Sequence, residues 1–257
     1  MEPRSLIPSF AAARALLRGA IDIVLPPLAL DEGQRGARVQ GQGLTAEVWR
    51  GLSFLEAPVC DGCGGALEYA DAGRCPACLS RRRAFDRARA AVVYDDASRD
   101  LILKLKHADR TDLAALFATW LARAARDLIE DADAVVPVPL HRWRLMTRQF
   151  NQAAEIARPL ARAAGLAYLP DVVVRRRATP IQGGRSASGR RRNVAGAFAV
   201  PRRAWQAVEG KRLILVDDVL TTGATAEACA RVLKAAGAAR VDVAAVARVK
   251  ELETRPI

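Results

Sequence analysis

The sequence of 257 residues is poor in aromatic residues, lysine and histidine. Aromatic side chains make up 5% of it, so a core must be built mainly from Leu, Val and Ala. Lys supplies 5 of the 40 basic residues, and there are 2 His. Arg carries a planar donor fork that suits phosphates and carboxylates, although GC-rich coding produces the same bias. Composition alone therefore selects no function.

Long apolar runs are missing as well. No uncharged apolar stretch approaches the ~20 residues of a membrane-spanning helix. The strongest N-terminal stretch, from Leu6 to Leu30, is interrupted by Arg14, Arg18 and Asp22. It also lacks the ordered basic, apolar and small-residue segments of a secretory signal, so we expect a cytoplasmic protein without a membrane span. The P-loop pattern G-x4-G-K-[ST] is absent, and no G-x-G-x-x-G follows a strand, which excludes two common phosphate-binding signatures.

The remaining balance is that of a globular protein, with 51% hydrophobic and 26% charged residues. The net charge of +12 is unevenly distributed. Residues 136–203 contain 14 Arg and 2 acidic residues, and the rest of the chain is neutral in sum. A positive field of that size attracts polyphosphates, and equally single-stranded nucleic acid.

Four of the five cysteines form two close pairs, Cys60 with Cys63 and Cys75 with Cys78. In a reducing cytosol such pairs would not persist as structural disulfides. The pattern C-x2-C-x11-C-x2-C can place four thiolates tetrahedrally around one Zn2+, and four protein ligands leave no open position on the metal. We therefore predict a structural zinc site, with a pair of redox dithiols as the alternative. Cys229 stands in an apolar helical pattern and is interpreted as a small buried hydrophobe.

Three regions follow one another along the chain. Residues 5–25 have the period of an amphipathic helix, and residues 31–47 are polar, Gly-rich and aperiodic. The cysteine pairs come next and end in the basic run 81–83. From residue 90 onward, short apolar runs alternate with helical patterns, which indicates a parallel α/β sheet. We expect strands over 91–94, 134–138, 171–174, 213–216 and 241–247, and helices over 98–106, 112–129, 151–164 and 224–236.

The segment 213–225 carries the clearest chemistry. Four apolar residues predict a buried strand, and Asp217 and Asp218 follow at its carboxyl end, where the ligands of open α/β sheets bind. The loop after them opens a helix, whose first N–H groups and dipole favour an anion. Carboxylates suit ribose hydroxyls, so the pattern predicts a ribose 5-phosphate site, with an ordinary strand-turn-helix as the alternative. The loop consists of Thr221, Thr222, Gly223, Ala224 and Thr225.

Residues 213–225 resemble the phosphoribosyl-diphosphate (PRPP) motif of type I phosphoribosyltransferases. More of the chain resembles one branch of these proteins, the ComF family, also called GntX-like proteins. With the cysteines, the resemblance covers about residues 58–250. The matching stretches are YDD at 94–96, LILKLK at 101–106, VPVPLHR at 136–142, FNQ at 150–152, TPIQ at 179–182, RNVAGAF at 192–198 and the PRPP motif.

The resemblance implies an α/β fold, with a type I phosphoribosyltransferase-like parallel sheet flanked by helices and preceded by a small N-terminal zinc ribbon. The corresponding domains are residues 1–57, an N-terminal helix and degenerate first ribbon or linker; 58–83, the zinc ribbon; and 84–257, the phosphoribosyltransferase-like domain. Family members usually carry two sets of zinc cysteines. The first set is missing here, so one zinc ion is expected. The family's R-G-F-N-Q reads R-Q-F-N-Q at 148–152, which keeps the polar residues but replaces a glycine by Gln149.

Residue roles follow from the same resemblance. Asp217 and Asp218 would anchor the ribose, the loop 221–225 would hold the 5-phosphate, and Mg2+ would accompany PRPP. Arg142 and Arg144 follow the strand expected over 134–138 and are candidates for binding the diphosphate; the alternative is a solvated surface position.

Residues 179–194 resemble the mobile catalytic loop that closes over PRPP. Small residues would supply its hinges, and Arg185 would neutralise the diphosphate leaving group in a closed, drier site. The alternative is an exposed basic loop without a catalytic role.

Two functions of different classes stay open. The first is an enzyme that binds PRPP with Mg2+ and transfers the phosphoribosyl group to an unknown nitrogen acceptor, a pentosyl-transferring glycosyltransferase. The second is a non-catalytic module of the DNA uptake machinery of natural competence, in which the same site senses PRPP or a nucleotide. Single-stranded DNA and competence helicase-type proteins are the partners that the resemblance implies for it. No residue stands out as a base for the acceptor.

Overall fold

The computed structural model describes residues 30, 39–40, 43–69, 73–106, 112–140, 150–177 and 194–250. The chain divides into two compact units, residues 1–51 and 52–257. In the first unit, strands β1 (Val39–Gln40) and β2 (Leu44–Thr45) pair antiparallel, and helix α2 (Ala46–Gly51) follows them. The helix expected over residues 5–25 lies outside the described residues.

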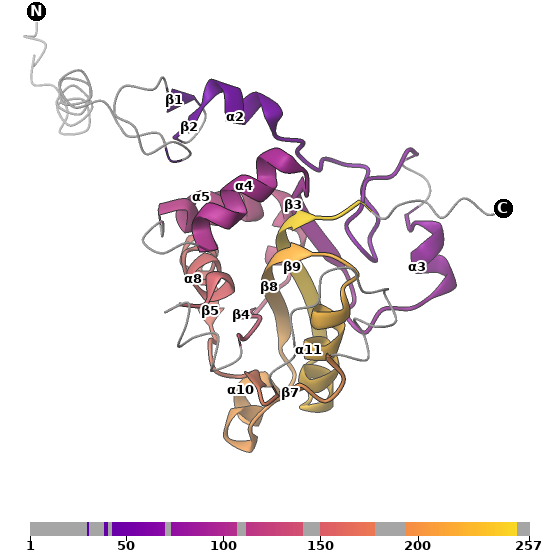
Figure 1. Ribbon diagram of the computed structural model, residues 1–257. Coiled ribbons are helices and arrows are strands. Elements are labelled where there is room, and N and C mark those ends of the chain that lie inside the picture. Colours follow the sequence, from indigo (N-terminus) through magenta and orange to yellow (C-terminus); the bar gives the residue numbers. More distant parts are fainter. Residues whose placement is uncertain are drawn as a thin grey trace, which may run out of the picture. The chain divides into compact units, whose positions relative to one another are not determined.

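The second unit is built on a sheet of five parallel strands in the order β3-β9-β8-β4-β5 (Figure 1). Its inner strands are buried on both faces, which explains why they read as nearly continuous apolar runs in the sequence. The strands are β3 (Ala88–Val93), β4 (Ala134–Pro137), β5 (Ala167–Tyr168), β8 (Arg212–Leu220) and β9 (Arg240–Arg248).

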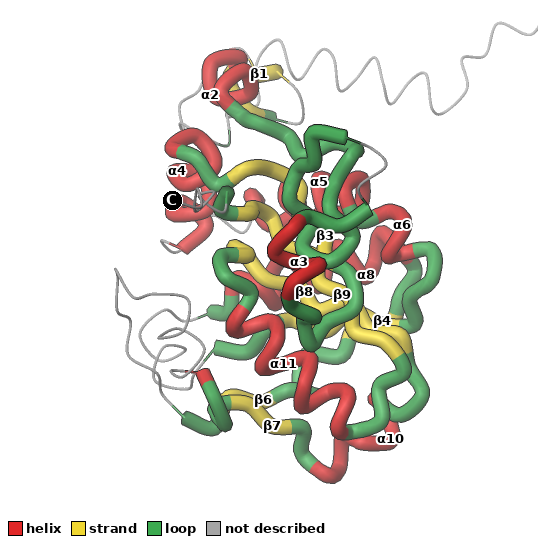
Figure 2. The backbone as a smooth tube through the Cα atoms, turned by 90° about the vertical axis from the view of Figure 1, so that its right-hand side faces the viewer, coloured by secondary structure: helices red, strands yellow, loops and turns green. Residues whose placement is uncertain are grey.

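Helices cover both faces of this sheet. Helices α5 (Asp112–Ala124) and α8 (Gln152–Ala164) pack on each other and on one face, while α11 (Ala224–Ala235) packs on β8 and β9 from the other face (Figures 1 and 2). Asn151 begins α8, because its side-chain oxygen accepts the N–H of Ala153 at 3.2 Å. Helix α4 (Asp96–Lys106) precedes α5, and α6 (Arg126–Ile129) follows it.

Several short elements complete the second unit. Helix α3 (Pro76–Ser80) follows the cysteine knuckles, and β6 (Val174–Arg175) pairs antiparallel with β7 (Phe198–Ala199) in a separate two-stranded sheet. A 3-10 turn, η2 (Arg202–Ala204), and helix α10 (Trp205–Val208) lead to β8. Among the described residues, no helix is both long and apolar enough to cross a membrane.

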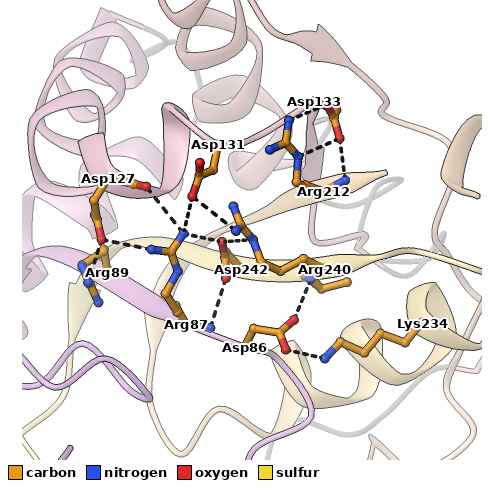
Figure 3. Close-up of polar contacts among 11 residues, drawn as sticks. Asp86, Arg87, Arg89, Asp127, Asp131, Asp133, Arg212, Lys234, Arg240 and Asp242 are labelled. Atoms are coloured by element: carbon orange, nitrogen blue, oxygen red, sulfur yellow. Dashed lines mark hydrogen bonds and ion pairs between the residues drawn. The ribbon is translucent and has the colours of Figure 1, made fainter. Parts of the chain in front are cut away.

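The amino ends of the strands are fixed by a network of ion pairs around Asp242, whose side chain is 2% exposed (Figure 3). Arg87 Nη2 lies 3.2 Å and Arg240 Nε 3.0 Å from its Oδ2. Both arginines also face Asp131, at 3.5 and 3.3 Å. Burial raises the pKa of Asp242, against the opposing effect of the two arginines. This network supports the end of the sheet that lies opposite the carboxyl ends of the strands.

Candidate functional site

The carboxyl ends of β4 and β8 form a switch point in the sheet. Helix α8 carries the chain from β4 outward to β5, whereas α11 carries it from β8 in the other direction to β9. Ligands of open parallel sheets bind outside the carboxyl ends of strands at such a point. The segment that leaves β8 here is the predicted ribose-phosphate motif, so the topology puts it in the position that the motif requires.

Asp217 and Asp218 lie inside β8, because the strand extends four residues beyond the expected end at Val216. Both side chains are half-buried. One oxygen of each accepts the next backbone N–H: Asp217 Oδ1 that of Asp218 at 2.9 Å, and Asp218 Oδ1 that of Val219 at 2.7 Å. Since strand side chains alternate, Asp217 continues the row of Leu213 and Leu215 that packs below α11, and Asp218 continues the other row. The two carboxylates thus flank the end of the strand.

The loop after β8 turns the chain into α11 at Gly223, which has φ +78°. This left-handed conformation favours glycine. A Cβ there would also lie 3.1 Å from Arg83 Nη1 and 3.4 Å from Phe85 Cε1. Thr221 is exposed, Thr222 and Thr225 are half-buried, and Ala224 is buried. Thr222 Oγ1 is buried and has no hydrogen-bond partner among the described residues.

Arg83 holds the loop from the side of the cysteine segment. Its side chain is 7% exposed, and Nη1 donates to the carbonyl oxygen of Thr222 at 2.8 Å. In a trans peptide the C=O and the following N–H point in opposite directions. Because Arg83 fixes the Thr222 carbonyl, it also directs the N–H of Gly223 to the other side of the loop.

Glu227 in the first turn of α11 is the acidic partner of this arrangement. Its side chain is 1% exposed and lies 3.6 Å from Arg83 Nη1. Arg81 binds it with two hydrogen bonds, Nη1 to Oε1 at 3.0 Å and Nη2 to Oε2 at 2.5 Å. Arg231 Nη1 approaches Oε2 to 3.6 Å. Arg81 and Arg83 of the basic run therefore attach the cysteine segment to α11.

The predicted diphosphate-binding residues Arg142, Arg144 and Arg185 lie outside the described residues. So do residues 178–193, which include most of the segment interpreted as a catalytic loop. The described part of the site is therefore the end of β8, the loop 221–225 and the residues that support it.

The four predicted zinc ligands lie together, with their Sγ atoms all within 4.8 Å of one another. Cys63 Sγ and Cys75 Sγ are 3.7 Å apart, close to the ~3.8 Å edge of a tetrahedron with Zn–S bonds of ~2.3 Å. Cys60, Cys63 and Cys78 are buried and Cys75 is half-buried, and none is in a disulfide. The residues present fit one zinc ion, which four thiolates would hold without an open coordination position.

The surroundings of the cluster shift the pKa of its thiols in both directions. The side-chain hydrogen bond with Cys63 lowers the pKa of Cys60 to about 4, and the N–H of Cys75 donates to Cys60 Sγ at 3.2 Å. Burial raises the pKa of Cys78, and the guanidinium of Arg83 opposes that rise. The side-chain hydrogen bond with Cys60 and burial raise the pKa of Cys63, and Arg248 at the end of β9 opposes that rise. Arg83 therefore contacts both the cysteine cluster and the loop 221–225.

The basic run 81–83 is evident in the sequence, but no partner was predicted for it. The signal that could have found one is Glu227, an acidic residue on the apolar side of the helical pattern 224–236. A carboxylate at a core position needs a cation. The sequence nevertheless does not show which arginine pairs with Glu227, because Arg81 and Glu227 are 146 positions apart.

Comparisons with known proteins agree with this architecture. The family model of the phosphoribosyl transferase domain matches residues 151–256. Competence protein F of Haemophilus influenzae is 31% identical over 198 residues, which cover 74% of this chain and 85% of that protein. DNA utilization protein YhgH of Salmonella typhimurium is 35% identical, and that of Escherichia coli K12 34% identical, each over 175 residues that cover 66% of this chain and 75% of the relative.

Among solved structures, a glutamine PRPP amidotransferase from B. subtilis superposes with a TM-score of 0.37 at 23% identity. The match covers 53% of this chain and 26% of that one, so this chain spans about a quarter of its length. The "HGPRT-ase" from Leishmania tarentolae, in complex with GMP, superposes with a TM-score of 0.26 at 16% identity, over 58% of this chain and 66% of that one. The parallel sheet flanked by helices, together with the domain match, confirms the predicted fold class.

Proposed function

This chain belongs to the ComF family, the family of competence protein F, and we propose that it binds PRPP with Mg2+ and transfers the phosphoribosyl group to a nitrogen acceptor. The observation that carries the proposal is the segment from Asp217 to Thr225 at the switch point of the sheet. There, two carboxylates and the first N–H groups of a helix adjoin each other. A sugar and its phosphate need that combination, because hydroxyls donate to carboxylates while a phosphate accepts from N–H groups.

Each part of the segment has a role in this proposal. The N–H groups at the start of α11 bind the 5-phosphate, and the Thr222 hydroxyl, which has no partner among the described residues, donates to a phosphate oxygen. Asp217 and Asp218 accept hydrogen bonds from the ribose hydroxyls. Arg83 keeps the N–H of Gly223 directed at the phosphate.

The carboxylates of Asp217 and Asp218 also fit a hard cation, since Mg2+ prefers oxygen ligands. Mg2+ bound with the diphosphate neutralises its charge as the bond to C1 of the ribose breaks. We propose that Arg142, Arg144 and Arg185 bind the departing diphosphate, and that residues 179–194 close over the site and exclude water.

Titration calorimetry of the full chain with Mg2+ and PRPP tests the proposal. Replacing Asp217 and Asp218 together by Asn removes two charge-assisted hydrogen bonds of about 1.5 kcal/mol each, so affinity falls by at least about 100-fold. The matched control is Asp100→Asn with Asp171→Asn, two exposed aspartates that have no polar partner among the described residues. Equal affinity of the folded D217N/D218N protein and of the control would refute the assignment.

A second candidate function has its own support. Relatives carry the names competence protein F and DNA utilization protein, and residues 136–203 concentrate the positive charge. In this alternative the PRPP site is a sensor in a cytoplasmic module that binds single-stranded DNA or competence helicase-type proteins. Diphosphate release from PRPP across a panel of bases and amines separates the two. Release with any acceptor supports the enzyme, whereas no release combined with strongly salt-dependent binding of single strands supports the module.

The division of the chain is part of the proposal. We assign residues 58–83 to a structural zinc ribbon with one ion, 84–257 to the phosphoribosyltransferase-like domain, and 1–57 to an N-terminal segment that lacks the first cysteine set of the family. The described cysteine cluster supports the first assignment.

A further inference from the structure

A cationic cavity of about 330 Å3 lies between the cysteine segment and helix α11. Among the described residues, five basic side chains and one carboxylate line it, and the ring of Phe85 adds an apolar wall. No residue of the loop 221–225 is among its lining residues. The cavity is lined by Gly62, Arg74, Cys78, Arg81, Arg82, Arg83, Phe85, Asp86 and Lys234.

Three of these cations already have acidic partners in the protein. Arg81 and Arg83 pair with Glu227. Lys234 donates to Asp86 Oδ1 at 2.8 Å, and the other oxygen of that carboxylate accepts the N–H of Val241 at 2.9 Å (Figure 3). Asp86, the only carboxylate among the described residues that line the cavity, is therefore occupied on both oxygens.

Two of the five basic side chains that line the cavity have no acidic partner among the described residues. Arg74 and Arg82 are exposed, and neither has a hydrogen bond or ion pair to any residue that the structure describes. Cys78 also lines the cavity, and Arg83 is the arginine that hydrogen-bonds its side chain. Two like charges at one cavity repel each other, and an anion bound between them would relieve that repulsion.

The side chains that line the cavity indicate which class of anion it binds. Guanidinium forks match phosphate oxygens in a bidentate way, and Lys234 retains N–H donors beside its bond to Asp86. The volume of about 330 Å3 exceeds what a bare phosphate fills, and Phe85 offers an apolar surface to an attached ring. We propose that this cavity is a second ligand site, which binds the phosphate of a nucleotide through Arg74 and Arg82. The nucleotide comes either as a free molecule or as a unit of a single strand.

Two probes distinguish these sources: dTMP in titration calorimetry, and fluorescein-labelled dT12 in anisotropy at several salt concentrations. The variant is Arg74→Gln with Arg82→Gln in the full, metal-loaded chain. The control, Arg99→Gln with Arg162→Gln, removes the same charge from exposed arginines that do not line the cavity. We expect R74Q/R82Q to weaken binding by about tenfold or more, relative to the control. For the strand, the salt slope falls by about 1.4, at ~0.7 for each lost phosphate contact.

The binding of the two probes identifies which form of the nucleotide enters the cavity. A loss confined to dTMP assigns a free nucleotide, a loss confined to dT12 assigns a strand, and a loss of both shows that either enters. Equal binding by R74Q/R82Q and the control for both probes overturns the proposal. The D217N/D218N protein separates this site from the phosphoribosyl loop, since it lacks no cavity residue and must keep the binding that R74Q/R82Q loses. If D217N/D218N loses that same binding, the cavity is not the site.

Discussion

Replacing the buried acid Glu227 by Gln should lower the stability of the protein more than any exposed Glu→Gln change. The substitution keeps the shape of the side chain and removes its charge. Three arginines then lose their counter-charge: Arg81, Arg83 and Arg231. The three arginines contribute unequally to the loss of stability. Arg81 and Arg231 are 43% and 52% exposed and can turn toward water, whereas Arg83 is 7% exposed.

The magnitude follows from that inequality. Removing one partner of a fully buried pair costs about 3–5 kcal/mol. Here one of three cations stays buried, and it keeps the carbonyl of Thr222 as a partner, so we expect a smaller cost of about 2–3 kcal/mol. For a unit of this size that corresponds to a melting temperature lower by roughly 4–12 °C. Thermal and urea unfolding followed by circular dichroism measure both quantities.

The control for this prediction is Glu130→Gln. Glu130 pairs with Arg126 at 3.0 Å on the surface, with side chains 64% and 82% exposed, so its loss should cost less than about 0.5 kcal/mol. If E227Q is destabilised by less than about 1 kcal/mol, or no more than E130Q, the arginines do not depend on the Glu227 charge and the reasoning fails.

Two further predictions concern the loop and the cysteines. Gly223→Ala places a Cβ against Arg83 Nη1 at φ +78°, and we expect it to weaken the binding of ribose 5-phosphate. The control is Gly210→Ala at φ +69°, which has no atom within 4 Å of the new Cβ and therefore shares only the backbone cost of about 1–2 kcal/mol. Equal binding of ribose 5-phosphate by both variants in titration calorimetry would contradict this prediction. Treating the protein with a zinc chelator should make four of its five thiols reactive to Ellman's reagent, while Cys229 reacts only on unfolding, because it is fully buried and burial raises the pKa of its thiol. Two reactive thiols, or five, would contradict a single four-cysteine site.

The strongest sequence patterns predicted their elements well. Four apolar residues, two acids and a threonine-rich loop specified β8 and the start of α11, and the spacing of the cysteines specified one cluster. These signals are local, because each consists of neighbouring residues whose burial, charge and backbone conformation all indicate the same structure. The helix expected over 151–164 was confirmed for the same reason, since Asn151 caps it and Gly165 ends it in the left-handed conformation.

Elements that depend on distant contacts were predicted less well. Of the strand expected over 171–174, Val174 alone lies in a strand. With Arg175 it forms β6, which pairs with β7 outside the main sheet, because the partner and not the sequence of the run decides pairing. The helix expected over 112–129 is divided near Ala125 into α5 and α6. The edge strand β5 was missed because its two residues show no period. Long-range ion pairs leave no local pattern at all.

The contacts of Arg83 connect the predicted ribbon to the predicted phosphoribosyl site. Arg83 is the last residue of the segment 58–83, yet it binds the carbonyl of Thr222 and approaches Glu227, both in the domain that begins at 84. Gly64 adds a second contact across the same boundary: it has φ +68°, and a Cβ there would lie 2.8 Å from the carbonyl oxygen of Ala88 in β3. A ribbon that loses its metal would release Cys78 and with it a neighbour of Arg83. Because Arg83 binds the carbonyl of Thr222, we expect the predicted ribbon to support the loop 221–225.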